Sequence, residues 1–289
     1  MVCPSQRELS ISELSAWNDI PKGHLFVLLK GYFDGGNKPD SRQYDTATLA
    51  FIAGERGGLS QFERAWKSLC KFHGADFLHT TDAVALTNHY EGWSDGQRNA
   101  FIQDCATLMV RSILHDENGR LVNGIIPATV TINLKDFKRV QTEVPDAPRD
   151  ATEILATQAF GKLIEAGQFL HTDFWELFFD RNEPYRGHVV DRIRSPKFVK
   201  FMTQNGVDIE RRFVVGPELD MRDFPALQAA DLLAWSVGQE NADRFPWQKT
   251  VLDMTREKEI LEYEVLRSPE PFTVNFVQYC RFPKRAATK

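Results

Sequence analysis

The chain has 289 residues, of which 42 % are hydrophobic and 26 % are charged, and its formal net charge is −5. This composition is typical of a soluble globular protein, and the acidic balance disfavours a protein that coats nucleic acid through a uniformly basic surface. A nuclease is still compatible with it, because an acidic metal site contributes negative charges that bound cations offset.

Several other classes are disfavoured by the sequence. No apolar run is long enough to span a membrane and the acidic N-terminal segment lacks a signal-peptide pattern, so we expect a cytoplasmic protein with no membrane partner. The cysteines match neither a zinc ribbon nor a disulfide framework, and the grouping of Cys70, His73 and His79 matches no strong zinc-ligand spacing. All four cysteines are far apart: Cys3, Cys70, Cys105 and Cys280.

The chain is predicted to open with an arm and a hairpin. Residues 1–23 form a weakly amphipathic segment that we expect to be a packing arm. The main domain is expected over 24–245, and a C-terminal helix and tail over 246–289 are expected to pack on it. The first two strands are predicted over 24–34 and 46–54 with a polar loop between them, which is typical of an antiparallel hairpin.

Two helices and a third strand are expected next. Ser60 and Ser94 are each followed three residues later by Glu or Gln, which is the spacing of a capping box, so each serine is predicted to begin a helix. The stretch 125–134 is rich in β-branched residues and is predicted to be a strand. The polar stretch 135–149 contains two prolines and is interpreted as a flexible connection.

The second half of the chain is predicted to alternate between helix and strand. Asp150 is expected to cap a helix that ends near residue 167, and an apolar strand over 174–180 follows. The next helix should break at Ser195-Pro196 and then resume, because proline lacks the N–H that a continuous helix requires.

The last predicted elements are a strand with one polar face over 207–215, a helix that carries Asp231, and a charged helix over 252–266. Strands come first in this order, then strands alternate with helices. The pattern predicts an α/β fold, in which a mixed sheet is flanked by helices.

Three acidic residues occupy positions that are unusual for a carboxylate. Asp34 and Asp180 each follow an apolar strand, and Asp231 lies in the apolar stripe of its helix. One Asp after a strand is more often a turn residue. If the two strands are parallel neighbours, however, both acids lie at the edge where open α/β sheets bind ligands. A buried Asp231 would then need a cation, a metal or several donors, because an unpaired buried carboxylate costs several kcal/mol.

The segments that carry these acids resemble a known family. Tyr32-Phe33-Asp34-Gly35, the strand end at Asp180, and Leu227-Gln228-Ala229-Ala230-Asp231-Leu232 are similar in order and spacing to the domain of unknown function 3800 family, a branch of the ribonuclease H-like superfamily. The closing motif matches the family form L-Q-x-A-D-L. The opening motif departs from it, because Gly35 and Gly36 stand where the family has Glu and Ser. The resemblance covers roughly residues 24–240.

The resemblance implies a ribonuclease H-like fold and a nuclease that hydrolyses phosphodiester bonds of RNA or DNA. Three carboxylates at strand ends suit Mg²⁺ or Mn²⁺, and a pair of such ions can activate water and stabilise the leaving oxygen. We therefore expect Asp34, Asp180 and Asp231 to be both metal ligands and catalytic residues, with Asp34 bridging the ions. Gln228, one turn before Asp231, is predicted to orient a water or a sugar hydroxyl, with a helix-surface amide as the alternative.

Two other functions are weighed against the nuclease. The first is a binding module for nucleic acid or protein that has kept the fold and lost the chemistry, which the departure at Gly35 makes conceivable. Retention of all three acids favours the enzyme. The second is a glycosidase that uses paired carboxylates, but it explains neither a third acid nor the closing motif.

Some roles are left open by the sequence. Basic residues after the middle acid could hold a phosphate backbone, although such a run is more often a solvated helix face. Protein partners and the oligomeric state are undetermined, and a homo-oligomer is compatible with the sequence. The basic residues are Arg181, Arg186, Arg192, Arg194, Lys197 and Lys200. The site residues with undetermined roles are Asp76, His79, Asp82 and Glu183.

Overall fold

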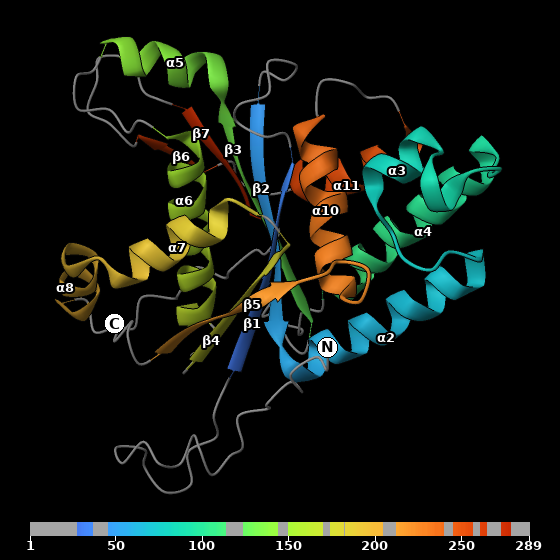
Figure 1. Cartoon of the computed structure of the whole chain (residues 1–289), viewed down its shortest axis with the longest axis horizontal. Coiled ribbons are helices and arrows are strands. Elements are labelled where there is room, and N and C mark those ends of the chain that lie inside the picture. Colours follow the sequence, from blue (N-terminus) through green and yellow to red (C-terminus); the bar gives the residue numbers. More distant parts are fainter. Residues whose placement is uncertain are drawn as a thin grey trace, which may run out of the picture.

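The strands of the protein form one mixed sheet in the order β5-β4-β1-β2-β3-β7-β6 (Figure 1). The computed structural model describes residues 28–36, 46–113, 124–143, 150–169, 174–181, 183–204, 212–239, 245–256, 261–264 and 273–278. The predicted N-terminal arm lies outside these residues. The strands are β1 Leu28–Gly36, β2 Thr46–Glu55, β3 Ile125–Asn133, β4 Phe174–Asp180, β5 Phe213–Leu219, β6 Leu261–Glu264 and β7 Thr273–Gln278.

Strand pairing brings three strand ends to one edge of the sheet. β2 is antiparallel to both β1 and β3, which confirms the predicted hairpin. β4 is parallel to β1, and β5 is parallel to β4. Because parallel strands run in the same direction, the carboxyl ends of β1, β4 and β5 lie at the same edge. The fold is therefore α/β with a mixed sheet, as the sequence predicts.

Helices cover both faces of the sheet and bury a core on each side (Figure 1). Side chains alternate between the faces along a strand, so Phe33 joins one core and Tyr32 the other. The first face is covered by α5 Leu134–Glu143, α6 Ala151–Phe169, α7 Tyr185–Arg194 and α8 Pro196–Gln204. The second is covered by α2 Arg56–His73, α3 Thr80–Ala85, α4 Asp95–Ser112, α10 Pro225–Gly238 and α11 Pro246–Arg256, and the short 3-10 helix η1 spans Asn88–Tyr90.

The two predicted capping boxes have different outcomes. Ser94 caps α4, and its Oγ accepts a hydrogen bond from Gln97 N at 3.2 Å. Ser60 does not begin α2, which starts four residues earlier at Arg56 after an N-cap Glu55 that makes no side-chain hydrogen bond. The reason is Leu59, which is 2 % exposed and extends the buried face of the helix by one turn toward the N-terminus.

Two further predictions are corrected. The stretch 135–149 was interpreted as a loop, but α5 begins this segment because Leu134 and Phe137, three residues apart, are both buried. The charged helix predicted over 252–266 is instead α11, which begins at Pro246 because Trp247 and Val251 are buried, and 261–264 is a strand.

β5 runs to Leu219, beyond the predicted end at 215, while residues 207–211 lie outside the described ranges. None of the helices in the described ranges is both long and apolar enough to cross a membrane.

Candidate active site

Asp34 and Asp180 occupy neighbouring positions at the edge of the sheet. The parallel pairing of β1 with β4 ends at Phe33 and Phe179, whose rings stack with centroids 4.8 Å apart. Each acid directly follows one of these paired residues. Asp34 is 6 % exposed, whereas Asp180 is half-buried. The structure thus places these two predicted site residues side by side in the backbone.

Asp231 reaches the same edge because α10 packs directly on β1. A Cβ on Gly36 would lie 2.8 Å from the carbonyl oxygen of Ala234, so only glycine permits this approach of strand to helix. Asp231 lies one turn before Ala234 and is 9 % exposed. The sequence predicts a single buried stripe on this helix, but every residue from Pro225 to Ala234 is buried. α10 is therefore a central helix between the sheet and the outer helices.

The charges of the acids act on one another's pKa. Burial raises the pKa of Asp34 well above its ordinary value, and the negative charges of Asp231, Glu183 and Asp180 raise it further. Burial also raises the pKa of Asp231, whereas the charge of His79 and the hydrogen bond from Thr80 N lower it and the charge of Asp180 raises it by a smaller amount. Asp34 Oδ1 accepts a hydrogen bond from Gly35 N at 2.9 Å, and no cation pairs with Asp34 among the described residues.

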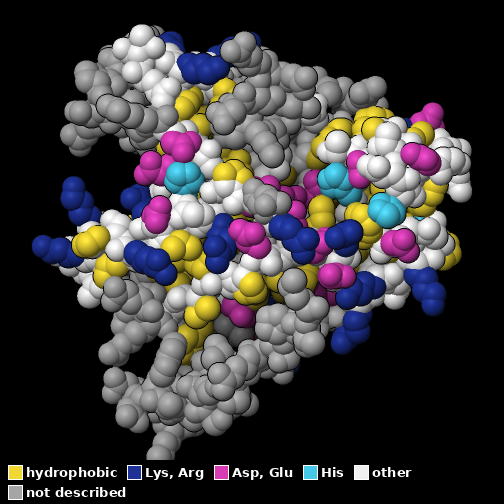
Figure 2. Space-filling model, in the orientation of Figure 1, with side chains coloured by type: hydrophobic (Ala, Val, Ile, Leu, Met, Phe, Trp, Pro, Cys, Tyr) yellow, Lys and Arg dark blue, Asp and Glu magenta, His cyan; other side chains and the backbone are white. Residues whose placement is uncertain are grey.

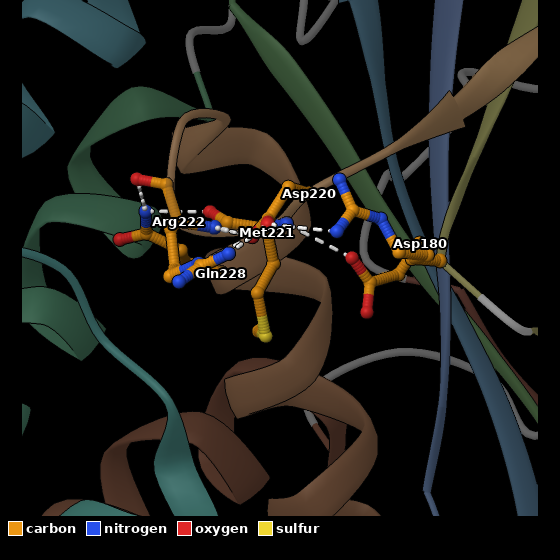
Figure 3. A network of polar contacts seen from close by, with 6 residues as sticks. Asp180, Asp220, Met221, Arg222 and Gln228 are labelled. Atoms are coloured by element: carbon orange, nitrogen blue, oxygen red, sulfur yellow. Dashed lines mark hydrogen bonds and ion pairs between the residues drawn. The ribbon is translucent and has the colours of Figure 1, made fainter.

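Backbone N–H groups fix one oxygen of each of the other two acids. Thr80 N donates to Asp231 Oδ2 at 2.6 Å. Met221 N donates to Asp180 Oδ1 at 2.9 Å (Figure 3). Burial raises the pKa of Asp180, although this bond from Met221 acts in the opposite direction. One oxygen of each of these carboxylates is therefore fixed by a backbone N–H outside its own element.

Gln228 is a buried anchor and not the water-orienting residue predicted from the sequence. Its Oε1 accepts hydrogen bonds from Trp66 Nε1 at 2.8 Å and from Leu78 N at 2.9 Å. Its Nε2 donates to the carbonyl oxygens of Met221 at 2.8 Å and Arg222 at 3.3 Å (Figure 3). These four bonds use the full capacity of the amide. No donor or acceptor is left for a water or a substrate, so we assign Gln228 a positioning role.

His79 lies beside the acids and is paired with Asp82. Its Nδ1 is 2.8 Å from Asp82 Oδ2. Burial lowers the pKa of His79, but the negative charges of Asp231, Asp82 and Asp180 outweigh this effect, so the net pKa is raised. Of the two acids near His79 whose roles the sequence leaves open, Asp82 belongs to this pair, and Asp76 is exposed to solvent.

Glu183 is a further acidic side chain at this edge. It follows β4 by three residues, and its N–H donates to the carbonyl oxygen of Asp180 at 3.3 Å. Its charge is one of those that raise the pKa of Asp34. The sequence signal that marks it is the spacing D-x-x-E at the end of an apolar strand, although this spacing is common in turns.

Three of the six basic residues after β4 make contacts within the protein. Arg181 lies 3.5 Å from Asp220, Arg186 donates to the carbonyl oxygen of Gly216, and Arg192 lies over the ring of Phe198. Figure 2 shows Lys and Arg side chains interspersed with Asp and Glu over the described part of one face.

The donor set at this edge consists of carboxylate oxygens, which suits Mg²⁺ or Mn²⁺ rather than zinc. As placed in the described part of the chain, no three or more His, Cys, Asp or Glu side chains are grouped closely enough to hold a metal ion. The zinc grouping of Cys70 and His73 is not formed either. Burial raises the pKa of the Cys70 thiol to about 12, and His73 Nε2 is 2.9 Å from Asp104.

The comparisons with known proteins add no assignment to this site. The chain matches no model of a known protein family. No curated protein matches it either.

Proposed function

We propose that the protein is a divalent-metal-dependent nuclease with a ribonuclease H-like fold, which hydrolyses phosphodiester bonds of RNA or DNA. The observation that carries the proposal is the convergence of Asp34, Asp180 and Asp231 at the carboxyl edge of the sheet. Their mutual charges raise the pKa of Asp34 and Asp231, and no cation among the described residues pairs with Asp34. The mixed sheet, with an antiparallel β2 between β1 and β3, supports the fold assignment.

Such a cluster is unfavourable unless positive charge is added. Two like charges about 4 Å apart repel by roughly 4 kcal/mol at an effective dielectric constant near 20. In the absence of metal, the acids either take up a proton or stay apart. This accounts for two observations: the pKa of Asp34 is raised, and the described acidic side chains are not grouped closely enough to hold an ion.

The residues of the chain then have distinct roles. Asp34, Asp180 and Asp231 would hold the ions, and Met221 N and Thr80 N would orient Asp180 and Asp231. Bound Mg²⁺ or Mn²⁺ supplies an activated water and stabilises the leaving oxygen. The His79 side chain is oriented by Asp82 and its pKa is raised, and in its protonated form it could protonate the leaving oxygen.

A binding module without catalytic activity is the second candidate. It is favoured by one observation, namely that the acids do not form a closed ligand set in the described residues. Such a module would bind nucleic acid or protein equally well with or without divalent ions. The two functions therefore differ in their response to a chelator.

The test is a cleavage assay over single-stranded, duplex and hybrid substrates with Mg²⁺, Mn²⁺ or chelator. We expect ion-dependent cleavage, and we expect Asp34→Asn and Asp231→Asn to reduce it by about 100-fold or more, as when a group that stabilises transition-state charge is removed. Asp191→Asn, a change of an exposed acid on α7, is the matched control. Binding without cleavage would support the module, and cleavage that persists in chelator would refute the metal mechanism.

A further inference from the structure

A groove of about 490 Å³ lies between α7 and β5. β5 is the last strand in the order of the sheet, so no further strand of the described sheet covers this side. Figure 2 shows, in the region of α7 and β5, hydrophobic side chains with Lys and Arg side chains on either side of them. The residues that line the groove are Arg186, Val190, Ile193, Arg194, Phe213 and Val215.

The two arginines of the groove lie at opposite ends of α7. Arg186 is in the first turn, where its Nε and Nη2 donate to the carbonyl oxygen of Gly216 at 3.4 Å and 3.3 Å. Because an arginine has five N–H donors, three remain for a bound group. Arg194 is the last residue of the helix, is exposed, and forms no hydrogen bond or ion pair with a described residue. The groove therefore has a positive charge at each end.

The spacing of these charges fits an extended peptide. Arg186 and Arg194 are eight residues apart on the helix, which corresponds to about 12 Å along its axis. In an extended chain, residues four apart point to the same side and are separated by about 13 Å. A peptide with two acids at this spacing would place the residue between them near Val190, which is midway between the arginines. Val190 and Val215 are both half-buried, so an apolar side chain can contact them.

The apolar part of the groove suits a peptide better than a nucleic-acid strand. Single strands are typically bound by stacking of their bases on aromatic side chains. Phe213 is the aromatic residue of the groove, but it is 6 % exposed and its ring is stacked on Trp175, with centroids 4.4 Å apart. The other apolar lining residues are aliphatic. The groove thus offers contacts for an aliphatic side chain and no open ring for a base.

We propose that the groove between α7 and β5 binds an extended acidic peptide of a partner protein, with the pattern acid-x-apolar-x-acid. Arg186 and Arg194 pair with the two acids, and the apolar side chain packs against Val190 and Val215. This interaction surface is separate from the proposed nuclease site, and the proposal does not depend on bound metal ions.

The test is the fluorescence anisotropy of a labelled peptide, Glu-Ser-Leu-Ser-Glu, titrated with the full chain. We expect saturable binding that weakens as the salt concentration rises, because salt screens exposed charges. A peptide with lysine in place of both glutamates should bind about 10-fold more weakly or not at all, because it repels the arginines. A peptide with serine in place of the leucine should also bind about 10-fold more weakly, because it loses the apolar contact.

Charge reversal at one end of the groove tests the site itself. Arg194→Glu should weaken binding of the acidic peptide by about 10-fold, since it replaces an ion pair with a repulsion. Arg111→Glu makes the same change of charge at an exposed position of α4, on the other face of the sheet, and should bind as the unmodified protein does. A peptide in which one of the two glutamates is lysine should recover binding to Arg194→Glu. If Arg194→Glu does not fold, Arg194→Gln decides, with an expected loss of about threefold.

Three results would overturn the proposal. The first is equal affinity of Arg194→Glu and Arg111→Glu for the acidic peptide, and the second is absence of peptide binding by the unmodified protein. The third is a labelled single-stranded oligonucleotide that binds in place of the peptide and is released by Arg194→Glu, which would make the groove a nucleic-acid site.

Discussion

Gln228 donates a hydrogen bond to the carbonyl oxygen of Met221, and the N–H of the same Met221 donates to Asp180 (Figure 3). A second connection of the same kind leads to Asp231. Leu78 N donates to Gln228, and Thr80 N, two residues further along the chain, donates to Asp231. One buried amide on α10 thus holds both loops that orient carboxylates of the site. Gln228 positions Asp180 and Asp231 without contacting either of them through a hydrogen bond among the described residues.

We expect Gln228→Met to destabilise the protein by about 2–5 kcal/mol, because it leaves several buried donors and acceptors without partners. Urea unfolding followed by circular dichroism measures the change. Gln103→Met is the matched control, since the Gln103 side chain is half-buried and bridges α4 to Thr250 on α11, and it should cost less than about 1.5 kcal/mol. Equal losses in the two variants would contradict the central role of Gln228.

Gly36→Ala should separate β1 from α10. The added Cβ would lie 2.8 Å from a backbone carbonyl oxygen of Ala234, so one of the two elements must shift, and overpacking of this kind typically costs about 1–3 kcal/mol. The shift also moves Asp34 away from Asp231, so Mn²⁺ binding should weaken. Gly161→Ala in α6 meets nothing within 4 Å and should stabilise the protein slightly. Unchanged stability of Gly36→Ala would show that this contact is not tight.

The strands that end at Asp34 and Asp180 and the helix that carries Asp231 were predictable from local pattern, whereas β6 and β7 were not. An apolar run that stops at an acid marks a strand end, and this pattern was sufficient to place Asp34 and Asp180 at the ends of their strands. Asp34 and Asp180 are adjacent only because β1 and β4 pair in parallel. The order of elements made this pairing plausible, and the structure shows it, with Phe33 opposite Phe179. For Asp231, helical spacing was sufficient, because a carboxylate among alanines and leucines cannot be a surface residue.

Features that depend on distant partners were not predictable. Gln228 is adjacent to Asp231 on the helix, but its role is set by Trp66 and Leu78, which are more than one hundred residues away in the chain. The close packing around Gly35 likewise depends on Tyr185 and Glu183, which are far from it in the chain. Helix α5 was missed because few of its residues are apolar, and burial of Leu134 and Phe137 against the sheet outweighs their polar neighbours.

Asp34→Asn should raise the thermal stability of the metal-free protein. The folded-state pKa of Asp34 is raised above the ordinary value of 3.8, so the ionised acid destabilises the folded state. This cost is absent below pH 3.8 and grows as the pH rises through the folded-state pKa. In chelator at neutral pH the variant should therefore unfold a few degrees higher than the unmodified protein, and the difference should shrink on acidification.

Addition of Mn²⁺ should reverse this order, because an ion that binds only the folded state stabilises it and the variant lacks a ligand. Thermal unfolding at several pH values, with and without Mn²⁺, measures both effects. A variant that is less stable than the unmodified protein in chelator at neutral pH would show that Asp34 is stabilised by a partner within the protein.

The His79–Asp82 pair predicts a pH dependence of cleavage. The charge of Asp82 is one of those that hold the pKa of His79 above its ordinary value of 6.5, and protonated His79 is the form that can protonate a leaving oxygen. Activity should therefore fall as the pH rises through the pKa of His79.

Two variants test this prediction. Asp82→Asn removes one negative charge, so it should move the decline in activity to lower pH. His79→Gln should abolish the decline and slow cleavage by about 100-fold. Mn²⁺ binding should change little in either variant, since neither side chain is assigned to the ion. The measurement is a pH–rate profile with Mn²⁺ titrations in parallel, and a profile that is unaltered by His79→Gln would exclude His79 as the proton donor.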